Sequence, residues 1–246
     1  MSKSRINWYK YAAPVNFYPL AGKMIPWFAG LTIVLFAIGL YMGFFIAPAQ
    51  DFQQHEYYRI ILIHVPAAWM GMFLYVLMAI YAGAGWAFNA RLASMMATAI
   101  APTGAIFTFI SLVTGSLWGR PAWGVYWVWD ARMTSTLILM FLYIGFISLQ
   151  SSIEDTRRAD RAGAVLALVG VINVPIIYFS VQWWSSLHQG ATLTTQGSKM
   201  AGSMLLPMLI LTFACWMYSI VVVLVRVRCI ILEREREAPR LAEATA

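Results

Sequence analysis

The sequence reads Trp118-Gly119-Arg120-Pro121-Ala122-Trp123-Gly124-Val125-Tyr126-Trp127-Val128-Trp129-Asp130 between two long apolar runs. Five large aromatic residues, two glycines and a terminal carboxylate lie in this short connection. Each flanking run is long enough to cross a lipid bilayer, which takes about 20 apolar residues in a helix. The connection therefore predicts a broad apolar surface at the boundary between membrane and water, and such a surface suits a large planar ligand.

The composition is typical of a protein that is built almost wholly inside a membrane. Of 246 residues, 61% are hydrophobic and 11% are charged, and the mean hydropathy is +0.70; soluble proteins carry about 25% charged residues. We expect an all-α polytopic integral membrane protein, with residues 1–246 forming one domain, a six-transmembrane-helix bundle. The apolar runs predict spans at residues 26–47, 60–82, 97–117, 133–151, 163–184 and 203–226.

The distribution of basic residues predicts how the chain crosses the membrane. Thirteen of the 17 lysines and arginines fall at the termini or in the connections after the second and fourth spans. The others are Arg59, Arg120, Arg132 and Lys199, on the opposite side. Because cytoplasmic segments are enriched in these residues, we expect both termini in the cytoplasm and the Trp-rich loop, residues 118–132, outside. The net charge of +7 is then a topology signal, and no nucleic-acid surface is expected.

The fifth apolar run contains two residues that predict a bend. Asn173 and Pro175 fall in the middle of this run. A proline inside a helix lacks the backbone N–H and clashes with the preceding turn. We therefore expect the fifth span to be bent at this point.

The chain has three histidines, and two of them are predicted to lie at the same depth. His64 falls about one helical turn inside the second span from its outer end, and His188 follows the fifth span by a few residues. An ionisable residue inside a span is a functional candidate by default, and imidazole is a common axial ligand of haem iron. The alternatives are a core histidine satisfied by a neighbouring carbonyl for His64, and a plain interfacial residue for His188. We expect His55, in a polar stretch, to be solvated.

The aromatic cluster also has a structural alternative, because tryptophan and tyrosine gather at headgroup level in many membrane proteins. Such a belt needs neither five rings in one short connection nor the glycines that permit close approach of a ligand. We therefore expect the cluster to form part of a haem site. Its members are Trp118, Trp123, Tyr126, Trp127 and Trp129.

Charged residues near the cluster complete the predicted site. Asp130 stands just before the fourth span, where its carboxylate can cap the first N–H groups of the helix, and we include it among the haem-site residues. Arg59, Arg120 and Arg132 are expected to pair with the anionic haem propionates, or to be interfacial charges that snorkel to water. No Cys-x-x-Cys-His motif occurs, so a covalently attached c-type haem is not expected.

The Trp-rich segment resembles the tryptophan-rich "WWD" signature of haem-handling membrane proteins. The length, the six spans, and the segments His64-Val65-Pro66-Ala67-Ala68-Trp69 and Trp183-Trp184…Leu187-His188-Gln189-Gly190 make the chain similar to the CcmC family of system I cytochrome c maturation. The resemblance extends from about residue 26 to the end of the last span. Tyr126 departs from the signature, where a tryptophan is frequent, but it keeps an aromatic ring.

This resemblance implies a haem-presenting scaffold of the bacterial inner membrane, rather than an enzyme with catalytic residues of its own. Haem b would be held edge-on by the outer loop, with His64 and His188 as axial ligands of the iron. The chain would present this haem for covalent attachment to a periplasmic haem chaperone during c-type cytochrome biogenesis. The implied partners are membrane lipid, the chaperone CcmE, the ABC transporter subunits CcmA and CcmB, and the small subunit CcmD.

A membrane b-type cytochrome subunit in quinone-linked electron transfer is the main alternative. Such a subunit usually has four helix-buried histidines near both membrane faces, whereas this chain has three histidines and none near the inner face. A solute permease would place charged residues deep in several spans. The predicted spans hold no charged residue well inside them, which disfavours a permease.

Overall fold

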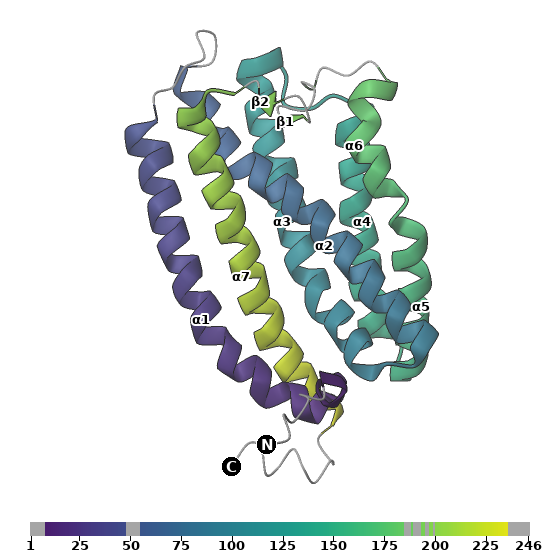
Figure 1. The fold of residues 1–246 in the computed structure, drawn as a ribbon. Coiled ribbons are helices and arrows are strands. Elements are labelled where there is room, and N and C mark those ends of the chain that lie inside the picture. The colour runs from purple at the N-terminus through teal and green to yellow at the C-terminus, as the bar shows by residue number, and fades with distance from the viewer. Residues whose placement is uncertain are drawn as a thin grey trace.

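The computed structural model describes residues 8–47, 55–184, 188, 193–194, 197–198 and 200–235 (Figure 1). Long helices make up nearly all of this part of the chain, which confirms the predicted all-α fold. The α-helices are α1 (Pro14–Tyr41), α2 (Ile61–Phe88), α3 (Arg91–Trp123), α4 (Ala131–Ser152), α5 (Thr156–Gly170), α6 (Asn173–Trp183) and α7 (Gly202–Arg234). The short elements are η1 (Trp8–Ala12), the π-helical η2 (Met42–Ile46), η3 (His55–Ile60), and the antiparallel strands β1 (Leu193–Thr194) and β2 (Gly197–Ser198).

Six segments of the described chain are long and apolar enough to cross a membrane, which confirms the polytopic class. They are Pro14–Ile46, Glu56–Phe88, Arg91–Trp123, Ala131–Ser152, Thr156–Trp183 and Gly202–Arg234. Several helix ends differ from the predicted span ends: α1 begins at Pro14 rather than at residue 26, and α7 continues to Arg234 rather than to residue 226. An apolar run marks the length that lies in lipid, whereas a helix continues beyond that length wherever its backbone hydrogen bonds and packing permit.

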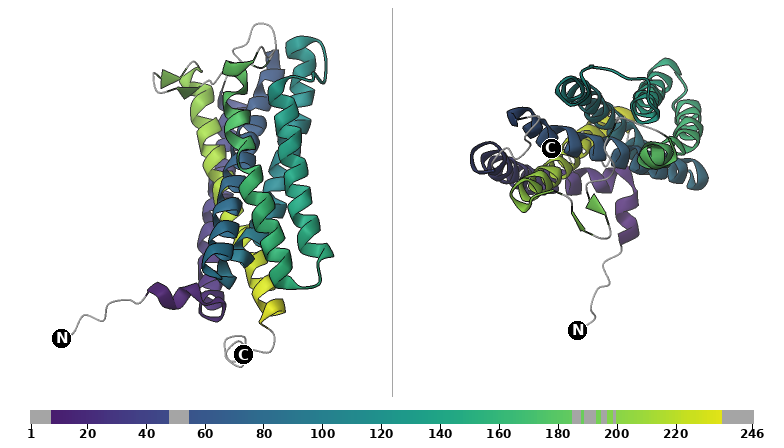
Figure 2. Two further views of the ribbon diagram at one scale, coloured as in Figure 1. Left: turned by 90° about the vertical axis from the view of Figure 1, so that its right-hand side faces the viewer. Right: turned by 90° about the horizontal axis from the view of Figure 1, so that it is seen from above.

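The helices are arranged around a central antiparallel pair, α2 and α3. These two are joined by a tight turn in which Asn89 has a left-handed conformation, with φ 49°. α1 and α7 pack against each other on one side of the pair, and α4, α5 and α6 lie on the other side (Figure 1). All the long helices run roughly along one axis (Figure 2). α1 begins and α7 ends at one end of the bundle, and the connection from α3 to α4 lies at the opposite end.

The fifth span is bent, as predicted. α5 ends at Gly170 and α6 begins at Asn173, so the helical hydrogen bonding is interrupted just before Pro175. The side-chain amide of Asn173 donates a 2.8 Å hydrogen bond to the backbone carbonyl of Ser135 in α4. Pro175 falls in the first turn of α6, where the missing N–H has no intrahelical partner to lose. The bend thus places α6 against α4 at the end of the bundle that contains the α3–α4 connection.

Close contacts through glycine hold the centre of the bundle together. The buried rings of Tyr75 and Tyr143 meet edge to face with their centroids 4.9 Å apart. The hydroxyl of Tyr143 donates a 2.8 Å hydrogen bond to the carbonyl of Gly71. Gly104 of α3 lies directly against the Tyr143 ring, and a Cβ atom there would be 2.5 Å from Tyr143 Cε1. Small residues at helix contacts allow backbones to approach closely, which is a usual means of helix association in membranes.

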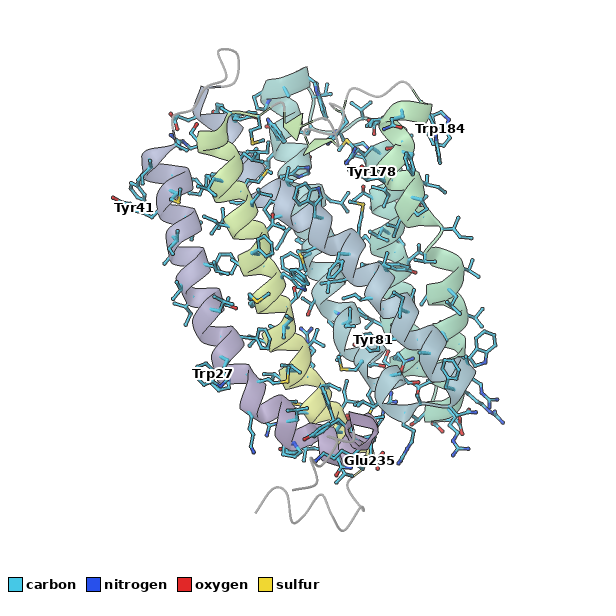
Figure 3. The ribbon with its side chains drawn as sticks, viewed as in Figure 1. Trp27, Tyr41, Tyr81, Tyr178, Trp184 and Glu235 are labelled. Atoms are coloured by element: carbon cyan, nitrogen blue, oxygen red, sulfur yellow. The ribbon has the colours of Figure 1, made fainter. Side chains whose placement is uncertain are left out.

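Two ion pairs tie the end of α7 to the neighbouring helices. Arg234 pairs with Asp160 of α5 at 3.0 Å, and Glu235 accepts from Arg91 of α3 at 2.6 Å. Glu235 lies at the lower end of the bundle in Figure 3, far from the labelled Trp184 at the end of α6. The two ends of the bundle therefore differ in chemistry: ion pairs join the helices at one end, and aromatic side chains gather at the other.

Candidate functional site

The site begins with His64, which lies in the first turns of α2 at the aromatic end of the bundle. Its side chain is buried, and its Nδ1 atom lies 3.0 Å from the hydroxyl oxygen of Thr114 in α3. The ring of Trp118, one turn further along α3, meets the imidazole edge to face with the centroids 5.8 Å apart. The histidine is thus held against one face of α3.

His188 completes the pair, from a non-helical position after α6. Its ring centroid lies 6.3 Å from that of His64, with an angle of 36° between the ring planes. The same ring lies 6.0 Å from the Trp123 ring at the end of α3. The structure therefore brings together the two histidines that the sequence predicted at one depth. His55 begins η3, and the prediction that its side chain is solvated lies outside what the structure describes.

The spacing of the two imidazoles fits a metal ion between them. An imidazole–metal bond is about 2 Å long, so two imidazoles on opposite sides of one ion have centroids about 6 Å apart. The observed 6.3 Å agrees with this arrangement. Two protein ligands suit a metal whose other ligands belong to a cofactor, as those of porphyrin iron do.

The Trp-rich segment is helical over its first half, in contrast to the predicted loop at residues 118–132. α3 continues to Trp123, and the non-helical connection runs from Gly124 to Asp130. Gly124 ends the helix because it has a left-handed conformation, with φ 82°, and its N–H donates to the carbonyl of Arg120 at 3.0 Å. An abundance of aromatic residues with a proline is typical of a connection, but the local glycine cap determines where the helix stops.

The aromatic side chains of this segment differ in how far they are exposed. Trp118 is buried and Trp123 and Trp127 are partly buried, whereas Tyr126 and Trp129 are 55% and 75% exposed. The side chains differ because the first of them lie on the last turns of a helix and the others lie on an extended connection. The segment therefore has an inner part beside the histidines and an outer part at the surface.

Trp127 provides a second sign of a ligand. Its indole Nε1 atom is buried and has no hydrogen-bond partner within the described part of the chain. A buried N–H donor without a partner costs about 1–3 kcal/mol, so such groups are normally satisfied by protein, water or a ligand. The carboxylate of a haem propionate could accept a hydrogen bond from this N–H. The unpaired donor of Trp127 is therefore consistent with a haem bound by the two histidines.

Gly119 allows the connection to fold back over the end of α3. A Cβ atom at this position would lie 2.9 Å from the backbone oxygen of Val125. Arg120 strengthens the same fold: its guanidinium donates to the carbonyl of Gly124 and lies 5.6 Å from the centre of the Tyr126 ring. Arg120 thus has a structural role in shaping the connection.

The other two candidate arginines have different surroundings. Arg59, in η3, forms an ion pair with Glu56 and donates to the carbonyl of Gly43, so it joins η3 to the end of the first span. Arg132 lies in the first turn of α4, within electrostatic range of His64 and Asp130. Of the three arginines, Arg132 is therefore the one whose charge lies within electrostatic range of His64.

Asp130 caps α4, as its position in the sequence predicted. Its carboxylate accepts a 2.8 Å hydrogen bond from the backbone N–H of Met133. The side chain is buried. The cap fixes the point at which the Trp-rich connection enters α4, and so it also holds Arg132 in place.

Replacing Asp130 by alanine should lower the free energy of unfolding by about 1 kcal/mol, because the α4 N–H groups lose their acceptor. Asn is as good an N-cap as Asp, so Asp130→Asn should retain most of the stability. Thermal unfolding of the purified, detergent-solubilised variants, followed by helical circular dichroism, measures the difference. Equal losses in the two variants would show that the charge matters rather than the cap.

Two residues of the site were not identified from the sequence. Thr114 and Gly115 lie within the apolar run of α3 and carry no motif. Thr114 touches His64, and a Cβ atom at Gly115 would lie 2.9 Å from His64 Cε1. One signal was available: Thr114 precedes Trp118 by four residues, so the two share a helix face.

Comparison with known proteins identifies the family of the chain. The family profile described as "Heme exporter protein C" (CcmC) matches residues 7–242. The chain is 45% identical over 235 residues to the heme exporter protein C of Escherichia coli (strain K12), with 96% of this chain and 95% of the relative covered. It is 44% identical to that of Bradyrhizobium diazoefficiens, over 95% and 89% of the two chains. A "putative cytochrome c biosynthesis ccmC-like mitochondrial protein" of Marchantia polymorpha is 42% identical, over 77% of this chain and 79% of the relative.

Proposed function

The chain belongs to the heme exporter protein C (CcmC) family, and from this premise we propose that it binds haem b between His64 and His188 and presents it at the outer face of the membrane. The recipient is a periplasmic haem chaperone that becomes covalently attached to the haem during c-type cytochrome biogenesis. The observation that carries the proposal is the 6.3 Å separation of the two imidazole rings, which suits two axial ligands of one iron.

The residues of the chain would bind and orient the haem. His64 and His188 would hold the iron through their imidazole nitrogens, and the rings of Trp118 and Trp123 restrict how the two imidazoles can turn. The buried Nε1–H of Trp127 and the guanidinium of Arg132 are available to the propionates. When bound, haem supplies the vinyl group to which the chaperone becomes attached. The contribution of the chain is orientation and control of iron ligation, which a scaffold can provide without catalytic residues of its own.

The exposed part of the Trp-rich segment supports a docking role for the same end of the bundle. Tyr126 and Trp129 are largely exposed, and aromatic residues are enriched at protein interfaces. We assign this surface to the chaperone CcmE. The ABC transporter subunits CcmA and CcmB and the small subunit CcmD are the other proposed partners, in line with the family.

The proposed orientation follows from the distribution of charge. Most lysines and arginines belong to the end of the bundle where α1 begins and α7 ends, and the positive-inside rule assigns that end to the cytoplasm of a bacterial inner membrane. The histidine pair and the Trp-rich segment then face the periplasm. Both features agree with presentation of haem to a periplasmic partner.

Titration of the purified full-length chain with haemin should give one haem per chain, with the absorption spectrum of a low-spin, six-coordinate iron. A single histidine pair accounts for one haem and no more. Co-expression with the chaperone should then yield chaperone that carries covalent haem, and expression of the chaperone alone should not. Two haems per chain would favour a b-type cytochrome subunit instead, and a chain that binds no haem would overturn the proposal.

A further inference from the structure

The hydroxyl group of Thr114 lies within hydrogen-bond distance of two backbone carbonyls of its own helix. The Oγ1 atom lies 2.6 Å from the backbone carbonyl oxygen of Ile110 and 3.3 Å from that of Ser111. Carbonyl oxygens only accept hydrogen bonds, and the Ile110 oxygen is nearer to Oγ1 than either the Ser111 oxygen or Nδ1 of His64 at 3.0 Å, so we assign the single hydroxyl proton of Thr114 to Ile110. The lone pairs of Oγ1 then remain available to accept a hydrogen bond from another group.

The group that meets these lone pairs is the imidazole of His64. Its Nδ1 atom lies 3.0 Å from Oγ1 of Thr114. Since the hydroxyl proton is directed to Ile110, the hydrogen between the two side chains belongs to Nδ1 of the histidine. A neutral imidazole carries one N–H, so Nε2 of His64 has no proton and presents its lone pair.

Two further contacts keep the ring in this orientation. Gly115 leaves room for the ring, because a Cβ atom there would lie 2.9 Å from Cε1 of His64. Trp118 meets the ring edge to face at 5.8 Å. The buried His64 of α2 therefore lies against three residues of α3: the hydroxyl of Thr114, the small Gly115 and the indole of Trp118.

We propose that Thr114 is a positioning residue for haem ligation: its hydroxyl accepts from Nδ1–H of His64 and so fixes the tautomer in which Nε2 is free to bind iron. This inference rests on the proposed haem function. Metal-binding histidines usually donate their second ring N–H to an oxygen acceptor, and loss of that acceptor typically lowers metal affinity by about 10–100-fold. Thr114 is a neutral acceptor of this kind inside a span, where a carboxylate would be costly.

The first experiment reads the tautomer directly and needs no haem. The apoprotein is labelled with ¹⁵N-histidine, and the His64 signals are assigned by their loss in a His64→Ala sample. The wild-type chain should show a protonated Nδ1 and an unprotonated Nε2, and Thr114→Val should show a substantial fraction of the other tautomer. A wild-type His64 protonated at Nε2 would overturn the proposal, even if the chain binds haem as proposed.

The second experiment measures haem binding. Thr114→Val, which preserves shape but removes the acceptor, should weaken haemin binding by about 10–100-fold and reduce the low-spin fraction of the spectrum. Thr114→Ser should restore both. The matched control is Thr212→Val in α7, where the hydroxyl also donates to the carbonyl four residues earlier, at 2.9 Å from Met208 O. This control should bind haemin like the wild-type chain.

Two outcomes separate the positioning role from a general loss of structure and from the proposed function. The apo forms of both variants should remain folded, with the helical circular dichroism of the wild-type chain. Thr114→Val should unfold at a somewhat lower temperature than Thr212→Val, because it also leaves a buried N–H of His64 without its acceptor. Wild-type affinity and spectrum in Thr114→Val would overturn the positioning role and leave the proposed haem site intact. Weak binding that Thr114→Ser does not restore would also overturn it, because the hydroxyl would then not be the group that matters.

Discussion

Replacing both His64 and His188 by alanine should abolish the spectrum of six-coordinate, low-spin haem in the purified chain. The centroids of the two rings lie 6.3 Å apart, and alanine offers the iron no donor at either position. Absorption spectroscopy of the haemin-loaded variant, in the oxidised and reduced states, measures the loss. Each single variant should retain one ligand and shift toward a five-coordinate spectrum.

His55→Ala is the matched control, because it removes the remaining histidine of the chain and should leave the spectrum unchanged. Thermal unfolding of the apo double variant, compared with the wild-type apoprotein, shows whether the fold survives. A double variant that is purified with an unaltered haem spectrum would rule out these two residues as the axial ligands.

Replacing Gly104 by alanine should destabilise the protein by about 2–4 kcal/mol, through overpacking and loss of a buried hydrogen bond. The new Cβ atom would overlap the hydroxyl and ring of Tyr143, which is fully buried. Tyr143 cannot move away without breaking its 2.8 Å hydrogen bond to Gly71 of α2. The gain in helix propensity from Gly to Ala is about 1 kcal/mol, too small to offset these costs. Chemical or thermal unfolding in detergent measures the change.

Gly30→Ala is the control for this substitution, since a Cβ atom at Gly30 in α1 meets no atom within 4 Å. That variant should be as stable as the wild-type chain or slightly more stable, because alanine favours the helix. Equal stability of Gly104→Ala and Gly30→Ala would mean that the contact between α3 and Tyr143 is not tight.

The sequence was sufficient to predict the membrane class, the bend and the cap. Apolar runs of about 20 residues form helices in lipid, because no water is present there and a helix satisfies its backbone hydrogen bonds within the segment itself. Pro175 predicts the bend from the covalent structure of proline alone, and Asp130 predicts the cap from its place before an apolar run. These are local properties, so they can be deduced from neighbouring residues.

Other features of the site could not be deduced in this way. The helical state of Trp118 and Trp123 depends on Gly124 adopting a left-handed conformation, and a segment with two glycines and a proline does not show by itself which glycine ends the helix. Arg59 and Arg132 look alike in the sequence, yet Arg59 pairs with Glu56 and Gly43 whereas Arg132 lies within electrostatic range of His64. Thr114 is one of several hydroxyl residues in apolar runs, and only its contact with another helix distinguishes it.

The sequence by itself determined that this chain has six apolar helices and that His64 and His188 fall at the same end of them. Each backbone group without a hydrogen bond in lipid costs free energy, so every apolar run of sufficient length predicts a helix from its own residues alone. Only the tertiary structure decided that the two imidazoles lie 6.3 Å apart and that Nδ1 of His64 lies 3.0 Å from the hydroxyl oxygen of Thr114. These contacts join α2, α3 and the segment after α6, and their distances depend on how side chains from different helices pack together.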